Sequence, residues 1–138
     1  MERNLTVEKR EAIEKGEIAL KALEDVRREL SGATAWSYLD LFGCGNLSGL
    51  LKHMKLNKAS ILLERAKDAI LSFKRELNDV ALIDDSFDID ISNLLTFFDF
   101  FTDGIIADYL VHRKINEAVR NTENAIYEIK SILVRLSS

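Results

Sequence analysis

LNKASILLERAKDAILSFKRELNDV, residues 56–80, is the stretch that decides the fold. Apolar residues recur along it at alternating intervals of three and four, for more than three heptads. This stripe consists of Leu56, Ala59, Leu63, Ala66, Ile70, Phe73, Leu77 and Val80. Such spacing is typical of the seam by which a helix packs in a bundle or coiled coil. The sequence therefore predicts a long helix over residues 47–80.

The same seam returns 59 residues later, in a stretch that aligns with the first without a gap. Residues 40–77 align with residues 99–136, and 13 of the 38 positions are identical. The shifted seam reads Ile115, Ala118, Thr122, Ala125, Ile129, Ile132 and Leu136. An internal duplication explains the match. It predicts two similar helical repeats, at residues 36–80 and 95–138, related by a pseudo-twofold axis.

A further helix is predicted before the repeats, over residues 6–31, with Thr6 at its start. Its apolar stripe comprises Ile13, Gly16, Leu20, Leu23, Val26 and Leu30. We expect Ser31-Gly32 to end this helix, because glycine readily adopts the left-handed conformation that closes many helices. A short helix should follow at residues 33–42, before Gly43-Cys44-Gly45 breaks the chain.

These elements together predict an all-α fold in one domain, residues 1–138. It is a helical bundle of four to five helices, with two long helices plus shorter elements. The absence of proline suits long uninterrupted helices, since proline removes a backbone donor and clashes with the preceding turn. Between the repeats lies the acidic run of residues 84–90. It lacks the central glycine and final glutamate of a calcium loop, so we expect a linker whose Phe87, Ile89 and Ile91 touch the core in alternation.

Charge and composition exclude several classes of protein. The formal net charge is −4, whereas nucleic-acid binders are usually basic, so no nucleic-acid partner is predicted. No stretch offers the ~20 continuous apolar residues of a membrane helix, so no transmembrane segment is predicted. The one cysteine, Cys44, excludes an internal disulfide framework and fits a reducing cytoplasm, where we expect the protein to reside.

One polar constellation is repeated in both halves as Asp-x4-Gly-x7-His. It consists of Asp40, His53, Asp99 and His112, and the two histidines are the only ones in the chain. Imidazole and carboxylate groups bind divalent metals. The four residues are a candidate metal site if the short element of each half folds back at its glycine, or if the two halves pair head-to-tail about the axis. In the alternative interpretation, the aspartates cap helices and the histidines satisfy structural positions.

Lys55 and Lys114 complete the repeated block, together with Asn57 and Asn116. In one interpretation the lysines hold a small anion in a polar pocket beside the histidines. In the other, which we favour, the lysines are solvated and the first helix of the repeat is interrupted at Leu56, with Asn57 capping the next segment.

A dense aromatic group is the second candidate binding surface. It comprises Trp36, Phe97, Phe98, Phe101 and Tyr109. Aromatic residues at helical spacing usually belong to the core. Several phenylalanines within five residues span more than one helical face, so part of this group would form a patch for a partner protein.

The aspartate, glycine and aromatic placement also carries a resemblance. The pattern Phe98-Asp99-x4-Gly104-x3-Asp108-Tyr109, with Trp36-x3-Asp40-x4-Gly45 in the first half, resembles a group of small all-helical bacterial proteins with no established activity. The resemblance covers residues 36–136 and implies a bacterial cytoplasmic protein.

Sustained heptads, an acidic balance and the lack of a nucleophile with a neighbouring base favour a non-enzymatic helical protein-interaction or scaffold module. It would bind a protein partner or itself, as a symmetric homodimer. The alternative function is a metal- or small-anion-binding protein that uses the repeated Asp/His pairs. No cofactor is predicted beyond that divalent metal.

Overall fold

The computed structural model describes residues 4–41, 45–92, 94–95 and 114–138, and gives only the helical backbone for residues 32–41, 45–60 and 114–118. Three long helices make up this part of the chain, α1 (Leu5–Leu41), α2 (Gly45–Ile83) and α4 (Lys114–Ser137), and the short 3-10 helix η1 (Asp85–Phe87) follows α2. The predicted all-α class is therefore confirmed. The described residues hold three long helices rather than the four to five predicted, and the duplication stays a prediction.

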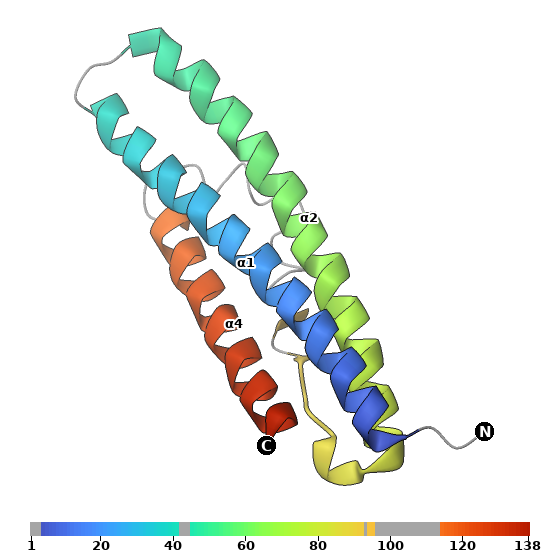
Figure 1. Cartoon of the computed structure of the whole chain (residues 1–138). Coiled ribbons are helices and arrows are strands. Elements are labelled where there is room, and N and C mark those ends of the chain that lie inside the picture. Colours follow the sequence, from blue (N-terminus) through green and yellow to red (C-terminus); the bar gives the residue numbers. More distant parts are fainter. Residues whose placement is uncertain (1–3, 42–44, 93, 96–113) are drawn as a thin grey trace.

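α1 is the central helix of the described bundle (Figure 1). It packs most extensively on α2 and next on α4, and both run antiparallel to it. Its burial explains the arrangement, because residues at heptad spacing along one side of α1 are shielded from solvent. They are Glu8, Ala12, Gly16, Ala19, Leu23, Val26 and Leu30.

This seam corrects the predicted stripe of α1. Ile13 and Leu20 are only half-buried, and Ala12 and Ala19 take the central positions instead. Small side chains there let α1 approach its neighbours closely. At Gly16 the side chains of Leu133 of α4 and Phe73 of α2 occupy the space that a β-carbon would need.

Both ends of α1 differ from the prediction. The helix begins at Leu5, and Asn4 caps it, because the Asn4 side chain accepts a hydrogen bond from the Thr6 N–H at 3.0 Å. The expected end at Ser31-Gly32 is wrong, since α1 continues through Gly32 to Leu41. Glycine inside a helix costs only about 1 kcal/mol relative to alanine, so it weakens a helix without ending it.

The seam of α2 is confirmed wherever its side chains are described. Leu63, Ala66, Ile70, Phe73, Leu77 and Val80 are all buried. The helix itself runs from Gly45 to Ile83, close to the predicted bounds. It passes unbroken through Leu56 and Asn57, so the predicted interruption there is wrong.

The seam of α4 is buried in the same register. Thr122, Ala125, Ile129 and Leu136 are buried, and Ile132 is partly buried against the core. Ile126 is also buried. These seam positions of α4 therefore face inward, as do the α2 positions that lie 59 residues before them. The matching α2 residues are Leu63, Ala66, Ile70, Phe73 and Leu77. The spacing of the seam was sufficient to predict the orientation of both helices.

The linker after α2 behaves as predicted, with Ile91 buried and Phe87 and Ile89 packed against the core. Its aspartates serve as caps. Asp84 accepts hydrogen bonds from the N–H and hydroxyl of Ser86, which hold the pKa of Asp84 below its ordinary value. Asp90 accepts a hydrogen bond from the Ser92 N–H at 2.9 Å and so caps the turn that follows.

None of the described helices combines the length and the apolar character that crossing a membrane requires.

Candidate functional site

The outer face of α4, opposite its buried seam, is the most unusual surface of the described bundle. It carries Asn124, Tyr127, Ser131 and Val134, all of them exposed and none of them charged. Tyr127 is 75% exposed and Val134 is 71% exposed. The outermost line of a surface helix normally carries charged residues. We call these four residues the α4 outer stripe.

A pocket of about 310 Å³ opens beside this stripe. It lies between α4 and the linker after η1. The lining residues are Ile89, Asp90, Tyr127, Glu128, Ser131, Ile132 and Arg135. Its walls thus combine apolar surface with two carboxylates and one guanidinium group, a mixture suited to the side chains of a binding partner.

Arg135 is held in place at the edge of this pocket. Its guanidinium donates a hydrogen bond to the Ser86 backbone carbonyl and lies 6.0 Å from the centre of the Phe87 ring. Lys9 Nζ of α1 lies 4.3 Å from the same ring centre. The Phe87 ring therefore makes cation–π contacts with Lys9 of α1 and Arg135 of α4, and these contacts join the linker to both helices.

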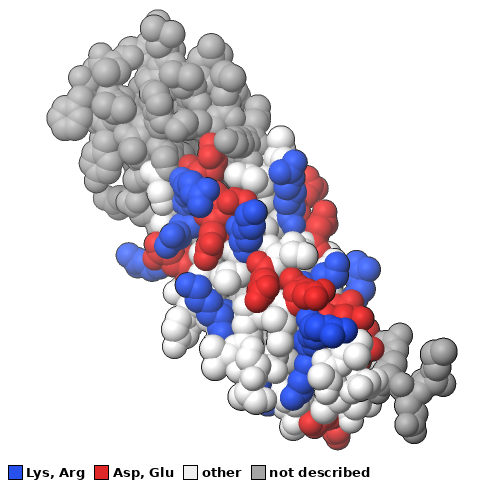
Figure 2. Space-filling view, viewed as in Figure 1, with Lys and Arg blue, Asp and Glu red and all other residues white. Residues whose placement is uncertain are grey.

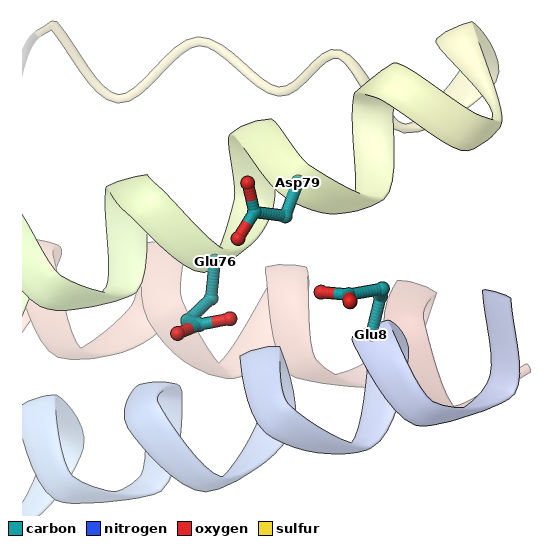
Figure 3. Close-up of side chains that lie close together, drawn as sticks. All are labelled: Glu8, Glu76 and Asp79. Atoms are coloured by element: carbon teal, nitrogen blue, oxygen red, sulfur yellow. The ribbon is translucent and has the colours of Figure 1, made fainter. Parts of the chain in front are cut away.

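A second polar cluster lies between α1 and α2 (Figure 3). Carboxylate oxygens of Glu8, Glu76 and Asp79 lie within 4.8 Å of one another. Glu8 occupies a seam position of α1 and is only 6% exposed. One oxygen of Glu76 is buried without a hydrogen-bond partner among the described residues. Three carboxylates this close repel one another unless a proton or a cation is shared.

Burial raises the pKa of Glu76 above its ordinary value of 4.5, and the negative charges of Glu11, Asp79 and Glu8 raise it further, against the opposing effect of Lys15. The folded protein therefore binds this proton more tightly than the unfolded chain does. As the pH rises from about 4.5 through the raised pKa, the unfolded state loses the proton first and stability falls. Above the raised pKa the whole of this unfavourable contribution is present.

We therefore expect Glu76→Gln to stabilise the protein at pH 7, by about 0.5 kcal/mol, the usual cost of a like-charge pair on a helix. The gain should shrink as the pH is lowered toward 4, where Glu76 in the parent protein becomes protonated. Urea unfolding at a series of pH values measures both effects. Glu64→Gln, an exposed site on the same helix, is the control. A gain that is the same at every pH would contradict the prediction.

The predicted Asp/His site lies mostly beyond the described side chains. Asp40 is in the last turn of α1, and His53 and Lys55 are in the third turn of α2, with backbone positions only. Lys114 is the first residue of α4, also described by its backbone alone. Asp99 and His112 are outside the described residues. The metal site stays a prediction.

The predicted aromatic patch also lies mostly beyond the described side chains. The backbone of Trp36 belongs to α1. Phe97, Phe98, Phe101 and Tyr109 lie outside the described residues. The aromatic residue that the structure does show on the surface, Tyr127, was not part of the prediction.

Two features of the structure were not predicted from the sequence. The seam position of Glu8 was detectable, because Glu8 lies four residues before Ala12, but the predicted stripe of α1 ran through Ile13 and Leu20. The α4 outer stripe was detectable as an uncharged interval between Glu123/Lys130 on one flank and Glu128/Arg135 on the other.

Comparisons of this chain with protein-family models, with curated proteins and with solved structures find no match.

Proposed function

We propose that this protein is a non-enzymatic helical interaction module, and that it binds another protein chain through the outer face of α4. The observation that carries the proposal is the α4 outer stripe, where Tyr127 and Val134 are both more than two-thirds exposed with no charged residue between them on the same line. Protein interfaces are depleted of charge at their centre and enriched in tyrosine.

The outer faces of the other two helices support this assignment by contrast. α1 exposes Arg10, Glu14, Glu17, Lys21 and Arg28, and charges of both signs cover it in Figure 2. α2 exposes Glu64, Arg65, Asp68, Lys74 and Arg75. Ile18 and Ile61 are exposed within these charged faces, as scattered apolar residues normally are. Only on α4, among the described helices, does an outer face keep an uncharged line over three turns.

A photo-crosslinking residue on the α4 outer stripe tests the proposal. Ser131 is replaced by benzoylphenylalanine in the full chain, expressed in the cells that encode it, and the same replacement at Glu14 on the outer face of α1 is the control. Both positions are exposed. We expect irradiation to produce a protein adduct from position 131 and none from position 14.

An absence of adducts from position 131, or equal adducts from both positions, would overturn the proposed function. The mass of the adduct identifies the kind of partner, because an adduct of twice the mass of the chain contains a second copy of it.

A further inference from the structure

We propose that the partner on the outer face of α4 is a second copy of this chain, so that two α4 helices pair side by side in antiparallel orientation about a twofold axis. This inference rests on the proposed function, since it uses the same face, but it names the occupant and the register. Three observations lead to it: the spacing of the stripe, the order of charges along its flanks, and the fixed position of Arg135.

The stripe has the spacing of a second helix-packing seam. Asn124, Tyr127, Ser131 and Val134 recur at intervals of three and four on the side of α4 opposite the buried seam, and the exposed Arg120 precedes them at the same spacing. Residues spaced in this way stay on one line and interlock with the same line of another helix. The inner seam of α4 packs within its own bundle, and the outer stripe leaves a second line on which one more helix can pack.

The flanking charges determine the orientation. Glu123 and Lys130 lie along one flank of the stripe, and Glu128 and Arg135 lie along the other. In a parallel pair, a residue on one flank of the first copy faces the residue on the other flank of the second copy that lies five positions later in the sequence. That arrangement brings Glu123 to Glu128 and Lys130 to Arg135 of the second copy. Both contacts join like charges, so parallel pairing is disfavoured.

An antiparallel pair places each flank against the same flank of the second copy. When the twofold axis passes between Ser131 and Val134, Glu128 of each copy faces Arg135 of the other, and symmetry forms this ion pair twice. The same register brings Tyr127 and Val134 of both copies into the contact. Moving the helices by one heptad places Glu128 against Glu128 and Lys130 against Lys130, so the first register is the favoured one.

Arg135 is already positioned for this role. Its contacts with the Ser86 carbonyl and the Phe87 ring fix the guanidinium beside the pocket that Glu128 also lines. A guanidinium has five N–H donors, so donors remain for a carboxylate of the second copy. Because the group is held before binding, less side-chain entropy is lost when the ion pair forms.

The expected dimer is weak. In this register the two helices overlap only from Tyr127 to the end of α4 at Ser137 in each copy, which is about 17 Å at 1.5 Å per residue. Each copy contributes only two large side chains from the stripe. Such a contact lies at the low end of specific interfaces, below about 1,200 Å², so dimerisation should depend on concentration and, through the ion pairs, on salt.

Sedimentation equilibrium of the full chain, from about 10 μM to about 1 mM, tests the proposal across the range of a weak complex. We expect a reversible monomer–dimer equilibrium. Val134→Glu and Tyr127→Glu should each weaken it by roughly tenfold or more, because each places a charge on the stripe. Ile18→Glu is the matched control, an exposed isoleucine on the outer face of α1, and it should leave the dimer unchanged. Circular dichroism checks that every variant folds.

A charge-exchange experiment tests the register. Glu128→Arg alone places two arginines at each contact, and Arg135→Glu alone places two glutamates there, so each variant should dimerise less than the parent. A mixture of the two variants restores both ion pairs across the interface, and it should form a heterodimer. Since the mixture restores only contacts between chains, a defect inside either variant would not be rescued.

The outcomes separate the two proposals. A chain that stays monomeric throughout, while position 131 crosslinks to a different protein, overturns the self-pairing and keeps the interaction module. A dimer that tolerates Val134→Glu and Tyr127→Glu overturns the assignment to α4. A dimer that needs both residues but gains nothing from the mixed charge variants overturns the antiparallel register.

Discussion

Phe73→Ala is expected to lower the free energy of unfolding by about 4 kcal/mol, within the usual range for removing a buried phenylalanine. Among the described side chains Phe73 is the largest that is fully buried, with no exposed surface. It projects from the α2 seam toward Gly16 of α1. Its removal leaves a cavity that glycine cannot fill, because glycine has no side chain. A loss of this size is a large part of the 5–15 kcal/mol that stabilises an ordinary domain.

Urea unfolding followed by circular dichroism at 222 nm measures this loss, with Leu82→Ala as the control. Leu82 lies on the same helix but is 83% exposed, so its truncation should change stability by less than about 0.5 kcal/mol. Equal losses in the two variants would show that Phe73 is not a core residue and would contradict the packing of α2 on α1.

Gly16→Leu is expected to destabilise the protein by about 3 kcal/mol. A β-carbon at Gly16 would lie 2.6 Å from Leu133 Cδ2 and 2.9 Å from Phe73 Cε1, both closer than non-bonded carbons approach. A longer side chain must displace a ring that is packed on all sides. This overpacking cost, typically 1–3 kcal/mol or more, exceeds the gain of up to about 1 kcal/mol from replacing a helical glycine.

Glu17→Leu is the matched control, because it makes the same side chain at the neighbouring, exposed position. It should be neutral or slightly stabilising. The double variant Gly16→Leu/Phe73→Ala adds a sharper test, since the leucine can occupy the space that the ring vacates. Its loss should be well below the sum of the two single losses. Simple additivity would show that Gly16 and Phe73 do not share one space.

The sequence predicted the orientation of the helices well where a seam was long. Six described positions of the α2 seam are buried, and the α4 seam, including the polar Thr122, follows in the same register. The alternation of Phe87, Ile89 and Ile91 in the linker was also correct. Hydrophobic spacing determines which side of an element faces the core, and it survives changes in the individual side chains.

The predictions that depended on single residues were less successful. Gly32 did not end α1, because a glycine changes helix stability by less than a long run of good helix formers and packed neighbours can supply. Two positions of the predicted α1 stripe were wrong by one residue, because the alanines Ala12 and Ala19 and not the larger Ile13 and Leu20 are fully buried. Where two helices approach closely, small residues occupy the centre of the contact.

The α4 outer stripe was not predicted because its distinguishing feature is the absence of charged residues, which no single residue reveals. Nothing in Tyr127 or Val134 alone distinguishes them from core residues of an amphipathic helix. Their position becomes informative only beside the inner seam of α4, which the sequence already predicts, because these residues lie on the opposite side of the helix. Glu8 likewise reads as an ordinary charge of a first helical turn until Glu76 and Asp79 are brought opposite it by the antiparallel arrangement of α1 and α2.

The central place of α1 has a consequence for how the protein is made. α1 leaves the ribosome before its two neighbours, yet its seam is covered from both sides only after α4, the last described helix, has been synthesised. The contact of Gly16 with Leu133 joins segments near opposite ends of the chain. Long-range contacts of this kind delay folding, because the chain must close a large loop before they form. The nascent polypeptide thus displays an apolar strip during translation, and a chaperone that recognises such strips should associate with it until release.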